Sequence, residues 1–325
     1  MPMSFIQARW RLFTSSWPAP MRGELKKYVR FRMVQPLRGS PGPPTHYVLF
    51  PTWLLHRFRP APSGSDKRFL REVLWGQFSL YLSFRIQDDL FDRDAGGVWL
   101  SFASDRLQLE SIRTFARLFP RQSPFWSIYF SSIESATMGL VRVDRMQRSR
   151  RRNVGTLLRE YTRVGSVFTV GSAAVCARYS TMRNFRQAAI FWHEMAIAAQ
   201  LLDDFEDLDQ DWGQKRLNSV ARIMLGKELP RLAGNGEALT AVKQALVAGG
   251  TDRIARIVLQ RMARAEKALE PIQRGKPYPG LRHYREDIER MRRSMHRENV
   301  RFFFAGSAEK RRHSPAPHID TGAIR

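Results

Sequence analysis

The 325-residue sequence predicts an all-α protein whose main part is a single large helical bundle. Long segments after Ser65 contain no proline, and their apolar residues recur at the three- and four-residue spacing of an amphipathic helix. No segment alternates apolar and polar residues, and no turn dipeptide joins two such segments into a hairpin. A hydrophobic content of 43% and a charged content of 26% are those of an ordinary globular chain.

Residues 1–64 are predicted to form a basic, proline-rich N-terminal extension with short helices. This stretch holds one acidic residue, Glu24, and ten prolines. Residues 1–20 read either as a transit-like leader or as an over-extended start that precedes Met21.

The main helical bundle is expected over residues 65–306. Its first helix spans 66–92, with Ser65 and Asp66 as N-cap material. This helix turns one apolar face inward: Phe69, Val73, Leu74, Phe78, Leu82 and Ile86. Further helices are predicted at 104–118, 124–149, 153–178, 181–208, 236–248, 251–270 and 280–304. The polar residues 307–325 are predicted to be a disordered tail.

The formal net charge of +24 indicates an anionic partner: nucleic acid, a membrane surface or a phosphorylated substrate. The single cysteine, Cys176, excludes an internal disulfide framework. No apolar run reaches the roughly 18 to 20 residues that span a bilayer. We therefore expect a cytoplasmic protein that can lie at the periphery of a membrane.

Two aspartate clusters carry the chemistry. Both read D-D-x-x-D, at Asp88–Asp92 and at Asp203–Asp207, and each follows an apolar helix. The outer aspartates of each cluster lie one helical turn apart, so their carboxylates repel unless a cation separates them. Two such motifs arise by chance with a probability well below ~0.001. Carboxylate oxygens at a partly open site suit Mg²⁺ bridged to a substrate phosphate.

On these motifs the sequence resembles the class I isoprenoid synthases, and most closely the trans-polyprenyl diphosphate synthases. Three local matches support the resemblance. Gln200 precedes Asp203 as in the family's F-Q-x-x-D-D pattern. The segment 163–168 is similar to the K-T-G-x-L-F segment, with Arg163 in place of the lysine. Residues 211–216, followed by Asn218, resemble the family's basic, glycine-containing loop.

The resemblance implies a bundle around a central cavity, with two carboxylate clusters that hold three Mg²⁺ ions and grip an allylic prenyl diphosphate. Loss of the neutralised diphosphate would leave a carbocation. The implied direct metal ligands are Asp88, Asp92 and Asp203. Metal contact through water or neighbouring groups is implied for Asp89, Asp204 and Asp207. The implied diphosphate contacts are Arg93, Arg163, Gln200, Lys215 and Arg216. The implied apolar pocket contains Phe84, which limits its depth, and Phe168.

The sequence departs from the chain-elongating pattern at the site for the second substrate, isopentenyl diphosphate. A single Arg93 stands where the family has an arginine pair, and Leu37–Ser40 only poorly imitates the early G-G-K-R-like segment. The main prediction is therefore a polyprenyl diphosphate synthase-like enzyme. The alternative is a terpene cyclase acting on one prenyl diphosphate.

Other functional classes fit the sequence less well. A basic nucleic-acid-binding helical protein is a distant alternative, because no recognised binding motif is present and carboxylates repel phosphate. A metal-dependent phosphohydrolase lacks its His-Asp adjacency, and a catalytically dead synthase would not retain six repelling carboxylates. The basic run 142–152 is either a solvated face or a surface for diphosphate or anionic lipid. The family resemblance also implies a homodimer.

Overall fold

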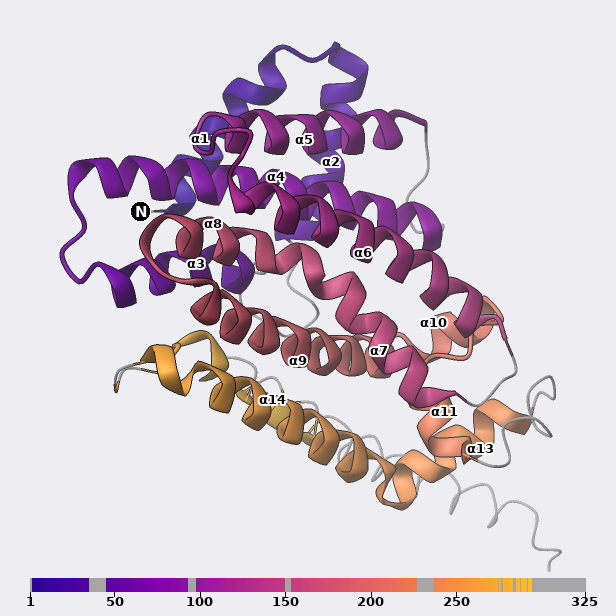
Figure 1. The fold of residues 1–325 in the computed structure, drawn as a ribbon. Coiled ribbons are helices and arrows are strands. Elements are labelled where there is room, and N and C mark those ends of the chain that lie inside the picture. Colours follow the sequence, from indigo (N-terminus) through magenta and orange to yellow (C-terminus); the bar gives the residue numbers. More distant parts are fainter. Residues whose placement is uncertain are drawn as a thin grey trace, which may run out of the picture.

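The computed structural model describes residues 2–34, 45–92, 98–149, 153–226, 237–273, 275, 277–282, 285–286, 288–290 and 292–293. Within these residues every regular element is a helix, which confirms the all-α prediction (Figure 1). Arg93 and the predicted tail at 307–325 lie outside the described residues, as does most of the helix predicted at 280–304.

Three helices form the N-terminal region: α1 (Pro2–Ser15), α2 (Ala19–Val34) and α3 (Thr45–Phe58). They are longer than the short pieces that the proline content suggested. Helix α1 packs on α4, α2 packs on α5, and α3 packs on α4 and α8. Ile6, Trp17, Leu25 and Phe50 are buried in the same hydrophobic cluster as the main bundle. The N-terminal region therefore contributes to the common core.

Helix α4 (Gly64–Asp92) carries the first aspartate cluster and packs along α5 (Val98–Ala116) (Figure 1). Its cap is Ser63, two residues before the residue expected. The Asp66 backbone N–H donates to Ser63 Oγ at 3.2 Å, and the Ser63 backbone N–H donates to Asp66 Oδ2 at 2.9 Å. This reciprocal pair is a capping box that fixes the start of α4. Helix α6 (Pro124–Gln147) starts in turn at the Ser123 cap.

The helix predicted over 153–178 is interrupted in the structure. It consists of α7 (Val154–Val164), a 3₁₀ turn η1 (Gly165–Thr169) and α8 (Val170–Tyr179). Ser166 Oγ donates to the Arg163 carbonyl at 2.6 Å, and Thr169 Oγ1 donates to the Ser166 carbonyl at 2.7 Å. Side-chain hydroxyls that bind nearby carbonyls compete with the regular helical ladder. Helical spacing alone does not reveal this competition.

Helix α9 (Met182–Glu206) carries the second aspartate cluster and packs along α14 (Thr251–Gln273) (Figure 1). Along the chain, α9 and α14 are separated by α10 (Leu208–Gly213), α11 (Ser219–Leu225), α13 (Glu237–Ala245) and the π-type turn η3 (Leu246–Gly250). Among the described helices, none is both long enough and apolar enough to cross a membrane.

The small residues after Arg163 serve close packing. A Cβ added at Gly165 would lie 2.4 Å from the Cβ of Ala196, and one added at Gly171 would lie 2.7 Å from Cγ of Pro51. The sequence left open whether these residues make room for a substrate or let helices approach. At Gly165 and Gly171 the structure favours close approach.

Candidate active site

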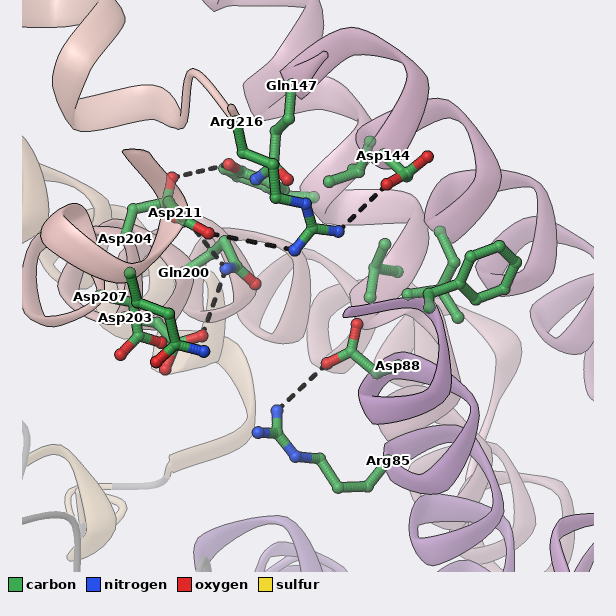
Figure 2. Close-up of a pocket in the computed structure, with 16 residues that line it drawn as sticks. Arg85, Asp88, Asp144, Gln147, Gln200, Asp203, Asp204, Asp207, Asp211 and Arg216 are labelled. Carbon is green, nitrogen blue, oxygen red and sulfur yellow. Dashed lines mark hydrogen bonds and ion pairs between the residues drawn. The ribbon is translucent and has the colours of Figure 1, made fainter. Parts of the chain in front are cut away.

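The two aspartate clusters come together at one pocket (Figure 2). Asp88 reaches it from the last turn of α4, and Asp203 and Asp207 reach it from the end of α9. Six aspartates line this pocket: Asp88, Asp144, Asp203, Asp204, Asp207 and Asp211. Of the described residues that line it, two are arginines, Arg85 and Arg216. Within the part of this strongly basic chain that the structure describes, the pocket lining thus carries an excess of negative charge.

Within the first cluster, neighbouring aspartates have different environments. The Asp88 side chain is 34% exposed and lines the pocket, whereas that of Asp89 is 1% exposed. Asp89 Oδ2 accepts a 2.5 Å hydrogen bond from the hydroxyl of Tyr28 on α2. Successive helical residues point about 100° apart, so two adjacent aspartates point in different directions, and Asp89 does not line the pocket. Asp89 instead ties α4 to the N-terminal region.

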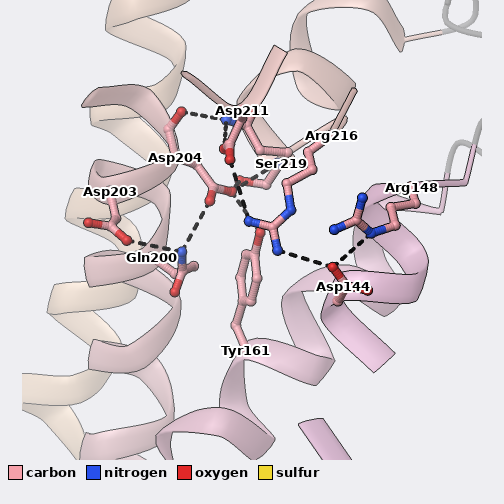
Figure 3. A network of polar contacts seen from close by, with 10 residues as sticks. Asp144, Arg148, Tyr161, Gln200, Asp203, Asp204, Asp211, Arg216 and Ser219 are labelled. Carbon is pink, nitrogen blue, oxygen red and sulfur yellow. Dashed lines mark hydrogen bonds and ion pairs between the residues drawn. The ribbon is translucent and has the colours of Figure 1, made fainter. Parts of the chain in front are cut away.

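In the second cluster both adjacent aspartates line the pocket, but they differ in burial. Asp203 is half-buried at the pocket, whereas Asp204 is 2% exposed. Asp204 Oδ2 accepts hydrogen bonds from the Tyr161 hydroxyl at 2.7 Å, from the Ser219 backbone N–H at 2.9 Å and from Ser219 Oγ at 2.5 Å (Figure 3). Burial raises the pKa of Asp204, and these donors oppose the rise by stabilising the carboxylate. Asp204 thus holds α7, α9 and α11 together.

Gln200 links the two aspartates of the second cluster. Its Nε2 donates to Asp204 Oδ1 at 3.1 Å and to Asp203 Oδ2 at 3.3 Å (Figure 3). A side-chain amide has two N–H donors, so Gln200 can serve both carboxylates at once. The Gln200 amide thereby helps to orient the Asp203 carboxylate, which lines the pocket.

Other residues predicted from sequence are placed differently. Arg163 lies outside the pocket lining and pairs with Glu160 at 3.0 Å. Lys215 is exposed, with a positive φ of 60°, and also lies outside the lining. Asp92 is the last residue of α4, but its side chain lies outside the described set, as does all of Arg93.

Arg216 does reach the pocket, but its charge is already partnered. Its side chain is 5% exposed and lies 3.1 Å from Asp144 and 3.9 Å from Asp211 (Figure 3). Asp144 also accepts a hydrogen bond from Arg148 Nε at 2.9 Å, and Arg142 lies 3.7 Å from Glu160, so described arginines of the basic run form ion pairs within the protein. A buried guanidinium held in this way fixes the loop after α10 against α6.

Sequence reasoning missed three charged residues of the pocket. Asp144 lies within the basic run 142–152, whose arginines dominate its composition. Asp211 was predicted only as part of the glycine-containing loop 211–216, with no role of its own. Arg85 precedes Asp88 by one helical turn, and this i, i+3 spacing was the signal that could have identified it. Burial lowers the pKa of Arg85, but the charges of Asp88, Asp89 and Asp203 outweigh burial and raise it well above its ordinary value.

Burial also dominates the titration of Asp211. Loss of water raises its pKa to about 7, and the charge of Asp204 acts in the same direction. The hydrogen bond of 2.8 Å from Asn218 Nδ2 and the charge of Arg216 act in the opposite direction. Asp211 therefore titrates near neutral pH.

The donor set fits a hard divalent cation such as Mg²⁺. The pocket offers carboxylate oxygens from Asp88, Asp203 and Asp207, on two different helices. Among the described residues, no three His, Cys, Asp or Glu side chains converge closely enough to form a metal cage. Mg²⁺ is usually held by one or two carboxylates together with substrate phosphates and water. An open arrangement of this kind fits a metal that arrives with a diphosphate.

Aromatic side chains fill the bundle below the aspartates. Phe84 lies one turn before Asp88 and is 6% exposed. Phe168 is half-buried, and its ring centroid lies 5.9 Å from Trp192 and 5.8 Å from Tyr81. Neither predicted aromatic lines the acidic pocket: Phe84 belongs to the hydrophobic core of the bundle, and Phe168 packs against that core.

Comparison with solved structures shows that this arrangement of helices is known. The apo form of an Arabidopsis medium/long-chain length prenyl pyrophosphate synthase superposes with a TM-score of 0.57 at 14% identity, over 91% of this chain and 99% of that one. The protein has the prenyl synthase fold. A polyprenyl synthase from Roseobacter denitrificans gives a TM-score of 0.54 at 14% identity, over 87% and 97% of the two chains. No family model matches the sequence, and no curated protein does.

Proposed function

We propose that the protein is a magnesium-dependent isoprenoid synthase that ionises an allylic prenyl diphosphate and transfers the prenyl group to isopentenyl diphosphate. The observation that carries the proposal is the convergence of Asp88 and Asp203, from α4 and α9, on one acidic pocket in a prenyl synthase fold. The fold on its own does not specify chemistry. Paired carboxylates over an apolar, aromatic interior do suit an ion-pair intermediate.

Each group has a defined task in this proposal. Asp88, Asp203 and Asp207 would hold the magnesium ions, three in the family that the sequence resembles, and thereby place the diphosphate over the pocket. Bound magnesium would supply positive charge to the departing diphosphate. The C–O bond electrons leave with the diphosphate, and the aromatic interior around Phe84 and Phe168 excludes water from the allylic cation. Asp89 and Asp204 keep the ligand-bearing helices in place.

A second candidate is a terpene synthase that acts on a single prenyl diphosphate. Both arginines that line the described pocket, Arg85 and Arg216, are engaged with aspartates. A second diphosphate would therefore need cations from elsewhere in the chain. The candidates differ in whether isopentenyl diphosphate is consumed.

The test is diphosphate release from geranyl, farnesyl and geranylgeranyl diphosphates with Mg²⁺, each with and without isopentenyl diphosphate. Release that requires isopentenyl diphosphate and yields a longer prenyl product supports chain elongation. Release without it supports the terpene synthase. Absence of release under every condition contradicts both.

A further inference from the structure

Among the described residues, Arg85 is the arginine that pairs with Asp88, the proposed metal ligand of the first cluster. Its Nη1 donates to Asp88 Oδ2 at 3.1 Å, and its Nη2 lies 3.3 Å from Asp89 Oδ1. Figure 2 shows its side chain extending from α4 into the space below Asp88 and Asp203. The negative charge of Asp203, on α9, also acts on this guanidinium. A single arginine thus interacts electrostatically with both aspartate clusters.

Arg85 differs from the other pocket arginine in how firmly it is held. Arg216 has a side-chain exposure of 5% and partners on two other segments, Asp144 and Asp211. The Arg85 side chain is 31% exposed, and its two nearest partners lie on its own helix. The Asp88 side chain is itself 34% exposed, so its ion pair with Arg85 is of the weak, partly solvated kind. The guanidinium can therefore leave Asp88 at little cost while it stays beside the buried Asp89.

The position of Arg85 has opposite consequences for a cation and for a diphosphate. A Mg²⁺ ion that approaches Asp88 alone must displace a guanidinium from that carboxylate or share the carboxylate with it. A diphosphate that arrives with Mg²⁺ offers new acceptor oxygens, to which a planar guanidinium can donate two parallel hydrogen bonds.

We propose that Arg85 is an internal counter-ion that couples metal binding to diphosphate binding, weakening the binding of metal alone and strengthening that of diphosphate with its metal. This inference rests on the proposed function, because it concerns the same site. It assigns to Arg85 a direct contact with the diphosphate, in addition to its ion pair with Asp88 in the unliganded state.

The experiment uses the full chain and two titrations. Mn²⁺ binding is followed by the EPR signal of free Mn²⁺, and binding of inorganic pyrophosphate in the presence of MgCl₂ is followed by calorimetry. Arg85→Gln is expected to bind Mn²⁺ alone about fivefold more tightly than the wild type. The same variant is expected to bind pyrophosphate about tenfold more weakly.

The matched control is Arg261→Gln. Arg261 is a half-buried arginine that pairs with Glu194 at 3.1 Å, and neither residue lines the pocket. It should leave both affinities unchanged. Arg85→Lys keeps the charge but lacks the planar fork, so it should retain wild-type Mn²⁺ affinity and still bind pyrophosphate more weakly. Circular dichroism establishes that each variant is folded, and Arg85→Lys carries the test if the glutamine variant is not.

The results separate this inference from the proposed function. The role of Arg85 is overturned if the wild type binds pyrophosphate with Mg²⁺ but Arg85→Gln either leaves both affinities unchanged or weakens both. That outcome leaves the proposed function intact. Wild-type protein that binds no pyrophosphate in the presence of Mg²⁺ overturns both. Opposite shifts in the two affinities support the inference.

Discussion

The Tyr161 hydroxyl donates a 2.7 Å hydrogen bond to Asp204, the second aspartate of its cluster, and Tyr28 makes the corresponding bond of 2.5 Å to Asp89 in the other cluster. Each D-D pair thus has one partly exposed aspartate at the pocket and one buried against a tyrosine, and the buried Asp204, unlike Asp89, also lines the pocket. In each pair, the first aspartate is therefore available to a ligand in the pocket. The second aspartate holds neighbouring helices together through its hydrogen bond to the tyrosine.

Tyr161→Phe should destabilise the fold. It removes one buried donor from a carboxylate, and a hydrogen bond to a charged group contributes about 1.5–3 kcal/mol. Urea unfolding should show this loss of unfolding free energy. The control is Tyr129→Phe, since the Tyr129 hydroxyl donates at 3.0 Å to the neutral Ser111 hydroxyl. Equal losses in the two variants would contradict a special role for the Asp204 contact.

Asp211 should make stability depend on pH. Its folded pKa of about 7 lies above the ordinary value of 3.8, so between these values the folded state binds more protons than the unfolded state. Its contribution to stability therefore falls as pH rises from about 4 to 7, by on the order of 3 to 4 kcal/mol. Asp211→Asn should remove this dependence. If the unfolding free energies of the wild type and Asp211→Asn follow parallel curves between pH 4 and 8, Asp211 is not the source of the pH dependence.

Gly165→Ala should destabilise the junction between η1 and α9. The added Cβ would lie 2.4 Å from the Ala196 Cβ, and overpacking of this kind costs about 1–3 kcal/mol. Gly155→Ala is the matched control on α7, where an added Cβ meets nothing within 4 Å. Its effect should be neutral or stabilising, by up to about 1 kcal/mol. Thermal unfolding of the two variants compares them directly, and similar melting temperatures would show that the packing at Gly165 is looser than described.

Much of the scaffold was predictable because helical periodicity is a local property. The spacing of apolar residues predicted α4, α6 and α9 to within a few residues of their observed bounds. The break at Gly165 was missed, because it depends on hydroxyl hydrogen bonds and on the approach of Ala196. The length of α1, α2 and α3 was underestimated, since proline content suggested short pieces, and burial against α4 and α5 stabilises these helices.

At the site, the sequence predicted that the two aspartate motifs converge. It did not predict which aspartates are exposed at the pocket and which are buried in hydrogen bonds to the scaffold. Asp88 and Asp203 could be named from motif spacing. The burial of Asp89 and Asp204 depends on Tyr28 and Tyr161, which lie 61 and 43 residues away in sequence. Arg216 was named as a diphosphate contact, yet its partners Asp144 and Asp211 come from separate segments that only the fold brings together.

The most direct test of the central claim is magnesium-dependent diphosphate release from an allylic prenyl diphosphate by Asp203→Asn and Asp209→Asn. Asp203 lines the pocket, whereas the Asp209 side chain is 68% exposed and pairs with Lys243 at 2.7 Å. We expect Asp203→Asn to lose at least about a hundredfold in rate, in line with the loss of a group that stabilises developing charge, and Asp209→Asn to retain the wild-type rate. Equal rates for the two variants, or release by the wild type without a divalent cation, would contradict the assignment of this pocket as the site of diphosphate ionisation.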